Sequence, residues 1–264
     1  MNFVFKSSPF FLSIFVGLLL TACMQVESLR QSPGLEASAS IQNTLVASAL
    51  FPTAASVLVP TSDRDRRPFR GKKAVMLGTS LTTQGLYLPY LQARTELSTI
   101  LNRAAQGQRV RTMADKLTAE DVNGAALISI EGSTNDYAFG FSIAGQVSDP
   151  AVTPSLCGDV KYVVQKIRSL NASVPIVVMN DTWRGPYYHH PVPPAPNPYG
   201  LTLEDASNAM MDVAAYLHLA HWDAYHWSGI SELNYSDYTY DNLHWNEEGA
   251  ALIGNGLGDY LNTL

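Results

Sequence analysis

From residue 71 onward, short runs of consecutive apolar residues alternate with segments in which apolar residues recur at helical spacing. Short apolar runs at 74–78, 97–101, 125–131 and 175–179 are typical of buried strands, and 222–225 predicts a short fifth strand. Helical patterns predict helices at 83–94, 108–117, 159–170, 203–219 and 246–261. This alternation of strand and helix predicts a parallel sheet with helices on both faces.

Local signals refine these boundaries. Thr202 stands at the N-cap position of the helix predicted at 203–219, and Pro89 weakens the one at 83–94. Segment 183–200 holds so many prolines and aromatic residues that we expect a loop there. The last predicted helix contains four glycines, which is typical of a helix packed closely against a sheet.

The first residues have the plan of a secretory signal. Lys6 precedes an apolar core at 10–20, and small residues follow it. The sequence Leu20-Thr21-Ala22-Cys23 resembles a bacterial lipobox, which implies cleavage before Cys23 and lipidation of that cysteine. An ordinary signal peptide and a single membrane anchor are the alternatives, although the apolar core is short for a spanning helix. We expect a lipid-anchored protein of the bacterial cell envelope, facing the periplasm or the exterior.

Three regions follow from these patterns. Residues 1–22 are predicted as a lipoprotein signal peptide, 23–70 as a lipidated N-terminus and flexible tether, and 71–264 as the folded domain. The tether is rich in Ala, Ser, Leu, Gln and Val and ends in a charged cluster at 63–67. That cluster is interpreted as a solvated segment, with contact to anionic headgroups as the alternative.

Composition excludes several classes of protein. The 264 residues carry a net charge of −6 and no basic stripe, so nucleic acid is not an expected partner. The chain has two cysteines, Cys23 and Cys157. If Cys23 is lipidated, Cys157 has no partner, and we expect no intrachain disulfide.

Four separate segments carry residues suited to nucleophilic acyl transfer. That chemistry needs a nucleophile, a base, a group that orients the base, and donors aimed at the oxyanion. Gly78-Thr79-Ser80 ends the first predicted strand and offers a hydroxyl. Segments 102–107 and 131–136 follow the second and third strands and offer a glycine N–H and a side-chain amide. Asp241-Asn242-Leu243-His244 offers a carboxylate and an imidazole on one side of a turn.

In this order, the four segments resemble the sequence blocks of the SGNH hydrolases, also called the GDSL esterases and lipases. The resemblance extends from residue 73 to the C-terminus and implies a three-layer α/β/α, flavodoxin-like fold. It implies Ser80 as nucleophile, His244 as general base and Asp241 as its orienting carboxylate. It also implies an oxyanion hole built from the N–H groups of Ser80 and Gly107 and the amide of Asn135.

Two positions depart from the family pattern. Thr79 stands where the family usually has Asp, and Ala104 stands where a first glycine is common, so the assignment of Gly107 depends on Asn102 and the strand before it. Each site residue also has a structural interpretation when taken singly. Ser80 suits a helix cap, Asn135 a turn, Asp241 a helix start, and His244 a packed imidazole.

The resemblance implies a serine hydrolase that cleaves a carboxylic ester, either a carbohydrate O-acetyl group or a lipid or other acyl ester. It implies no metal and no organic cofactor. An O-acyltransferase using the same site is one alternative. A non-catalytic, carbohydrate-binding envelope module with this fold is another.

Other candidates lie in the aromatic and histidine-rich segments. Aromatic residues in 183–199 and 227–240 are interpreted either as packing or as the walls of a substrate cleft that suits sugar rings and acyl groups equally. Arg184 is a candidate partner for an acidic substrate group or a surface residue. The pattern predicts no metal site, because no Glu or Cys completes a recognisable zinc pattern with the histidines at 189, 190, 218, 221 and 226.

Overall fold

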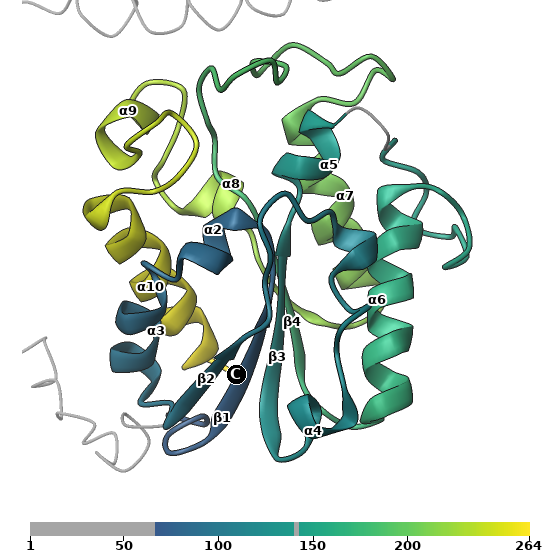
Figure 1. Cartoon of the computed structure of the whole chain (residues 1–264), viewed down its shortest axis with the longest axis vertical. Coiled ribbons are helices and arrows are strands. Elements are labelled where there is room, and N and C mark those ends of the chain that lie inside the picture. The colour runs from purple at the N-terminus through teal and green to yellow at the C-terminus, as the bar shows by residue number, and fades with distance from the viewer. Residues whose placement is uncertain (1–66, 140–142) are drawn as a thin grey trace, which may run out of the picture. The chain divides into compact units, whose positions relative to one another are not determined.

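The computed structural model describes residues 67–139 and 143–264. Within them, five parallel strands form one sheet in the order β2-β1-β3-β4-β5 (Figure 1). The strands are β1 (Lys73–Leu77), β2 (Thr99–Asn102), β3 (Ala125–Gly132), β4 (Ile176–Asn180) and β5 (Ala220–Trp222). This is the flavodoxin-like order, and it confirms the predicted fold class.

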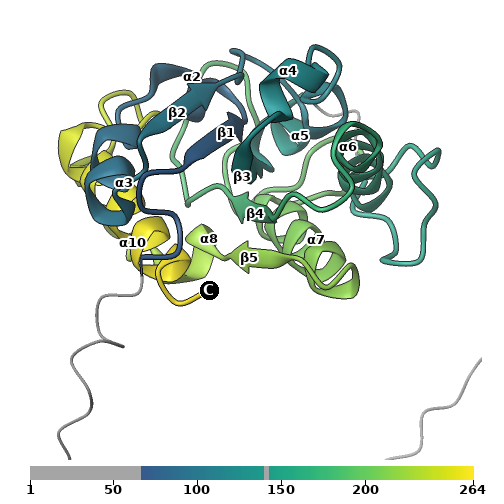
Figure 2. The same cartoon turned by 90° about the horizontal axis from the view of Figure 1, so that it is seen from below.

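Helices cover both faces of the sheet. In Figures 1 and 2, α3 and α10 lie on one face, and α6 and α7 lie on the other. The helices are α2 (Ser80–Gln84), α3 (Leu88–Thr95), α4 (Ala119–Val122), α5 (Thr134–Ala138), α6 (Leu156–Leu170), α7 (Leu203–Tyr216), α8 (Ala224–Trp227), α9 (Tyr235–Tyr238) and α10 (Glu247–Leu261).

The alternation of side chains along β1 explains why the core has two halves. Ala74 and Met76 join the cluster that α3 and α10 cover. Val75 and Leu77 point the other way, into the cluster that α6 and α7 cover. Because successive side chains of a strand point to opposite faces, a strand buried on both sides becomes a continuous apolar run.

Most predicted elements are present, with shifted ends. Thr202 caps α7 through a capping box with Asp205, as its sequence position predicts. The helix predicted at 83–94 is divided, because Gly85 ends α2 in the left-handed conformation and α3 begins with Pro89 in its first turn. The predicted strand at 222–225 is displaced to Ala220–Trp222, since Asp223 caps α8.

The helix predicted at 108–117 is wrong. That segment holds one 3-10 turn, Val110–Thr112, followed by turns in which each N–H bonds three residues back, such as Met113 to Val110 and Leu117 to Ala114. The side chains of Val110, Met113, Ala114 and Leu117 are all buried. The apolar spacing therefore predicted the buried side correctly but not the winding of the backbone.

The N-terminal predictions fall almost entirely outside the described residues. The signal peptide at 1–22, Cys23 and most of the tether at 23–70 lie there. Of the tether's last residues, Phe69 is buried in the core, and Arg67 and Arg70 pair with Glu96. Packed structure therefore begins before residue 71.

Candidate active site

The turn that carries Ser80, the predicted nucleophile, follows β1 at the carboxyl edge of the sheet. A Cβ at Gly78 would lie 2.4 Å from Glu131 Oε2, so only glycine fits between the turn and β3. Thr79 is the N-cap of α2, and its hydroxyl accepts the backbone N–H of Leu81 at 3.2 Å. Ser80 is thereby the first residue of a short helix that begins three residues after the end of β1.

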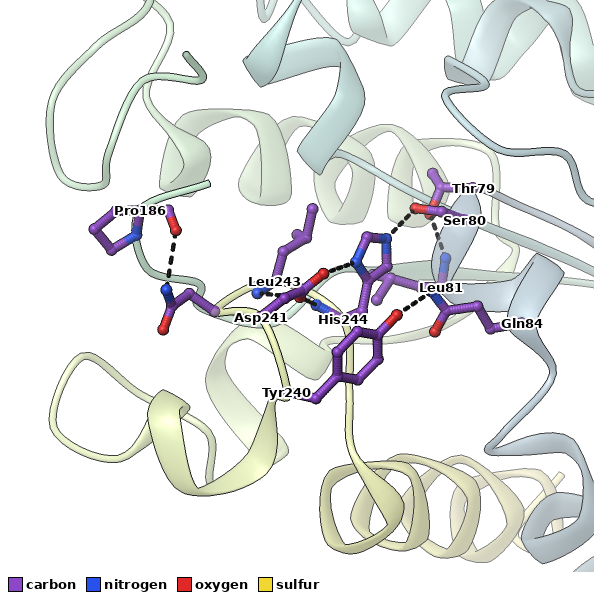
Figure 3. Close-up of polar contacts among 10 residues, drawn as sticks. Thr79, Ser80, Leu81, Gln84, Pro186, Tyr240, Asp241, Leu243 and His244 are labelled. Atoms are coloured by element: carbon purple, nitrogen blue, oxygen red, sulfur yellow. Dashed lines mark hydrogen bonds and ion pairs between the residues drawn. The ribbon is translucent and has the colours of Figure 1, made fainter. Parts of the chain in front are cut away.

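Residues from the two ends of the fold meet at Ser80. The Nε2 atom of His244 lies 2.9 Å from Ser80 Oγ, and its Nδ1 atom lies 2.7 Å from Asp241 Oδ2 (Figure 3). Ser80 and His244 are both buried. The three side chains therefore have the geometry of a nucleophile, a base and an orienting carboxylate.

Hydrogen bonds fix the orientation of Asp241. Its Oδ1 accepts the backbone N–H groups of His244 at 2.7 Å and Leu243 at 3.1 Å, which leaves Oδ2 for the imidazole. A carboxylate only accepts, so the imidazole carries its proton on Nδ1. Nε2 is then free to accept the Ser80 proton.

Aromatic rings flank the imidazole. Tyr240 lies parallel to His244 with ring centroids 5.8 Å apart, and Tyr187 meets the ring edge-on at 5.4 Å. The Tyr240 hydroxyl accepts the Gln84 amide at 2.7 Å (Figure 3). Since Gln84 is on the same short helix as Ser80, this bond ties the segment that carries His244 to α2.

The candidate oxyanion donors lie beside the nucleophile. Asn135 is buried in the first turn of α5, and its Nδ2 donates to the carbonyl oxygen of Gln108 at 2.9 Å. An amide nitrogen has two hydrogens, so a second remains for a ligand. Gly107 has a φ of +68°, which favours glycine, and lines the same pocket.

A pocket of about 310 Å³ brings the predicted residues together. Its lining includes all five of them: Ser80, Gly107, Asn135, Asp241 and His244. The other lining residues are Gln84, Gln106, Phe139, Tyr187, Tyr188, His190, Tyr240 and Leu243. One wall therefore comes from loop 183–199, which is free of helix and strand as predicted.

Arg184 has neither of the roles considered from sequence. It is 1% exposed and donates to Thr134 Oγ1 at 3.0 Å and to the carbonyl oxygens of Gly185 and Pro191. Burial lowers the pKa of Arg184 to about 10, so the side chain is still charged at neutral pH. Arg184 thus holds the aromatic loop against α5.

Sequence analysis missed two buried carboxyl groups beneath the site. Glu131 is the second-last residue of β3 and Asp181 follows β4, and both are fully buried. Burial, and next the negative charge of Glu131, raise the pKa of Asp181 well above its ordinary value. Glu131 lies within the apolar run 125–131. A charged residue in a run that predicts a buried strand was the sequence signal for a buried carboxyl group.

The histidine and cysteine residues raise two further questions, metal binding and thiol reactivity. The described residues contain no group of three or more His, Cys, Asp or Glu side chains placed to hold a metal ion. Cys157 is buried and free, and burial raises its pKa to about 11. Over the ranges 67–139 and 143–264, no helix is long and apolar enough to cross a membrane.

A serine, histidine and aspartate at the carboxyl edge of a flavodoxin-like sheet define a class of serine hydrolase-like proteins. The sequence model of the GDSL-like Lipase/Acylhydrolase family matches residues 76–252, more than half of the chain. The chain belongs to that family, as the four sequence blocks predict, and it is an esterase.

Solved structures share the fold. A Lactobacillus plantarum protein has a TM-score of 0.64 at 19% identity, over 74% of this chain and 98% of that one. A lipase/acylhydrolase from Enterococcus faecalis scores 0.52 at 14% identity, over 73% and 96%. An inhibitor-bound aryl esterase from M. smegmatis scores 0.51 at 14% identity, over 73% and 99%. None of the curated proteins compared with the chain matches it.

Proposed function

We propose that this esterase cleaves carboxylic esters through an acyl-enzyme on Ser80. The observation that carries the proposal is the placement of His244 between Ser80 and Asp241, at 2.9 Å and 2.7 Å. Ser80 Oγ attacks the ester carbonyl carbon while its proton passes to His244 Nε2. Asp241 stabilises the imidazolium cation that results.

The second half of the reaction uses the same groups. The imidazolium returns its proton to the leaving alkoxide, and His244 then activates a water that hydrolyses the acyl-enzyme. The N–H groups of Ser80 and Gly107 and the amide of Asn135 bind the negative oxygen of each tetrahedral intermediate. No metal or organic cofactor takes part in this scheme.

The pocket supports an acylated sugar or a lipid ester as substrate. Phe139, Tyr188 and Tyr240 are exposed around its rim, and Gln84 and Gln106 line it. Aromatic faces stack on sugar rings and also contact acyl chains, while the amides bind hydroxyl groups. The acyl chain length that gives the highest kcat/KM separates a deacetylase from a lipase.

We also propose that Cys23 is lipidated and anchors the enzyme to a membrane of the cell envelope. The support is the sequence at 20–23 and the apolar segment before it. Metabolic labelling with a clickable fatty acid tests this. Label in the wild-type chain and none in Cys23→Ser supports the anchor, and equal label in both refutes it.

The catalytic proposal is tested with p-nitrophenyl esters of increasing acyl length and a fluorophosphonate probe. We expect turnover and labelling by wild type, and neither by a Ser80→Ala variant whose circular dichroism is unchanged. Thr83→Ala is a matched control, because Thr83 is on the same short helix but does not line the pocket. Turnover retained in folded Ser80→Ala would contradict the proposal. Labelling without hydrolysis, with transfer to an added alcohol, would identify an acyltransferase instead.

A further inference from the structure

Two fully buried carboxyl groups lie between the nucleophile turn and the oxyanion turn. Glu131 pairs with Met179 across strands β3 and β4, and Asp181 follows β4 by one residue. Both side chains are 0% exposed. A buried carboxylate is costly unless hydrogen bonds or opposite charges compensate it, so this pair needs a specific arrangement.

Each carboxyl group holds one of the two turns. Glu131 accepts the backbone N–H of Thr79 at 2.8 Å and the Thr79 hydroxyl at 2.9 Å, directly before Ser80. Asp181 Oδ2 accepts the backbone N–H of Thr134 at 2.7 Å, directly before Asn135. The nucleophile and the candidate oxyanion amide are therefore each one residue from a bond to this pair.

One atom of the pair is unsatisfied if both groups are ionised. Asp181 Oδ1 is buried and accepts no hydrogen bond. An ionised carboxylate can only accept, but a protonated one has an O–H to donate. Because Glu131 pairs with Met179, two residues before Asp181, the two side chains project from the same face of the sheet. The charge of Glu131 and its hydrogen bonding also contribute to the raised pKa of Asp181. A proton on Asp181 Oδ1 donated to Glu131 satisfies the orphan atom.

Other charged and titratable groups face the pair. Asp136 on α5 adds negative charge and further raises the pKa of Asp181. Tyr87, between α2 and α3, has its pKa raised by burial and by Glu131, so it is neutral. Arg184 interacts with Asp181 but donates its N–H groups to Thr134 Oγ1 and to backbone carbonyls. None of these groups supplies a hydrogen bond to Asp181 Oδ1.

We propose that Glu131 and Asp181 share a single proton, and that this bond fixes the Ser80 turn relative to the Asn135 turn. The proposal rests on the proposed serine esterase mechanism and assigns both residues a positioning role. A hydrogen bond between a carboxylic acid and a carboxylate is short and strong because the acceptor is charged. Without the proton, two buried negative charges repel each other, and the turns they hold move apart.

The shared proton gives the folded state a distinct pH dependence. In the unfolded chain Asp181 ionises near pH 4. The folded pKa of Asp181 is raised, so between these two pKa values the folded state binds one proton more than the unfolded state. Stability then falls as pH rises through this window. Because the two states differ by one bound proton, the unfolding equilibrium constant increases tenfold for each pH unit within this window.

The first arm of the test measures urea unfolding of the full chain from pH 5 to pH 8. In Asp181→Asn, the amide oxygen still accepts the Thr134 N–H, and the amide nitrogen donates to Glu131 without titrating. Between pH 5 and the folded pKa of Asp181, we expect the unfolding constant of wild type to rise about tenfold per pH unit relative to Asp181→Asn, and above that pKa we expect the difference to level off. Parallel curves would overturn the proposal.

Asp121→Asn is the matched control for this arm. Asp121 is also a buried aspartate, but its hydrogen bond with Arg103 lowers its pKa. Because it is ionised in both states above pH 5, its removal changes stability by a constant amount there. We therefore expect the Asp121→Asn curve to run parallel to the wild-type curve. An Asp121→Asn curve that instead follows the pH dependence of Asp181→Asn would overturn the assignment of the proton to the pair.

The second arm measures positioning. Asp181→Ala removes both the bond to Glu131 and the acceptor of the Thr134 N–H, and we expect kcat to fall roughly 10- to 100-fold with KM within about threefold of wild type. Asp181→Asn should restore kcat to within about threefold. Wild-type kcat in a folded Asp181→Ala would overturn the positioning role. If Asp181→Ala does not fold, Asp181→Asn must keep the wild-type kcat and show the stability difference.

The two proposals fail separately. If wild type neither turns over esters nor reacts with a fluorophosphonate, the proposed function fails, while the unfolding arm still reports on the proton. If Ser80 is labelled but the unfolding curves are parallel, the esterase stands and the shared proton does not.

Discussion

Replacing Asp241 with asparagine tests how the imidazole is held. Asp241 Oδ1 accepts two backbone N–H groups, at 2.7 Å and 3.1 Å, and Oδ2 faces His244 Nδ1. An asparagine that keeps its oxygen on the backbone turns its NH₂ toward the imidazole. Two donors cannot face each other, so the ring proton moves to Nε2. In that tautomer Nε2 cannot accept the Ser80 proton.

The opposite orientation of the amide is less stable. It turns the NH₂ group toward the two backbone N–H groups and loses both hydrogen bonds. With the Asp241 side chain 28% exposed, we take the lower limit of about 1 kcal/mol for each bond, which makes about 2 kcal/mol in total. The unproductive tautomer is then favoured by roughly 30-fold. Loss of the charge that stabilises the imidazolium cation adds to this effect.

We therefore expect kcat in Asp241→Asn to fall on the order of 10⁴-fold, which is about 5 kcal/mol of transition-state stabilisation. The assay is hydrolysis of p-nitrophenyl acetate, with active sites counted by fluorophosphonate titration. Asp237→Asn is the control, because Asp237 is exposed nearby and its replacement changes the charge equally. A folded Asp241→Asn that keeps kcat within tenfold of wild type would refute this reasoning.

Two further predictions concern the oxyanion site and the buried thiol. In Asn135→Ala, kcat should fall about 10²- to 10³-fold, because one donor to the oxyanion is lost; a change confined to KM would make Asn135 a ground-state binding residue. In a Cys23→Ser chain at pH 7, Cys157 should react with a disulfide reagent only after urea unfolding, because burial shields the thiol and raises its pKa to about 11. Rapid reaction of the folded chain would show that the thiol is accessible.

The sequence predicted the fold because the strand signals are local. The side chains of the first strand alternate between the two halves of the core, and the strand is followed by Gly78, where a side chain does not fit. The helix beginning after Thr202 carries its own capping box. By contrast, segment 108–117 has helical spacing but a backbone of successive tight turns, and its Val110 N–H donates to Asp136 of α5. No local pattern encodes that contact.

The site was predictable for a different reason. Its polar residues stand directly after strands or before the last helix, and parallel strands end at one edge of the sheet. Glu131 and Asp181 were missed because their roles depend on the pairing of β3 with β4 and on the approach of Thr79. Arg184 was misjudged because its burial depends on how loop 183–199 folds back onto α5. Such contacts are set by tertiary packing.

The distance in sequence between the nucleophile and its base affects how the enzyme is made. Ser80 and His244 are 164 positions apart, and His244 comes just before the terminal helix, which Asn262 fastens to the carbonyl oxygen of Arg94. β1 and its serine are synthesised long before the histidine. Under the proposed mechanism, Ser80 gains its base only when the segment that carries Asp241 and His244 docks beside it. A folding intermediate that lacks this docked segment would therefore have no activated serine.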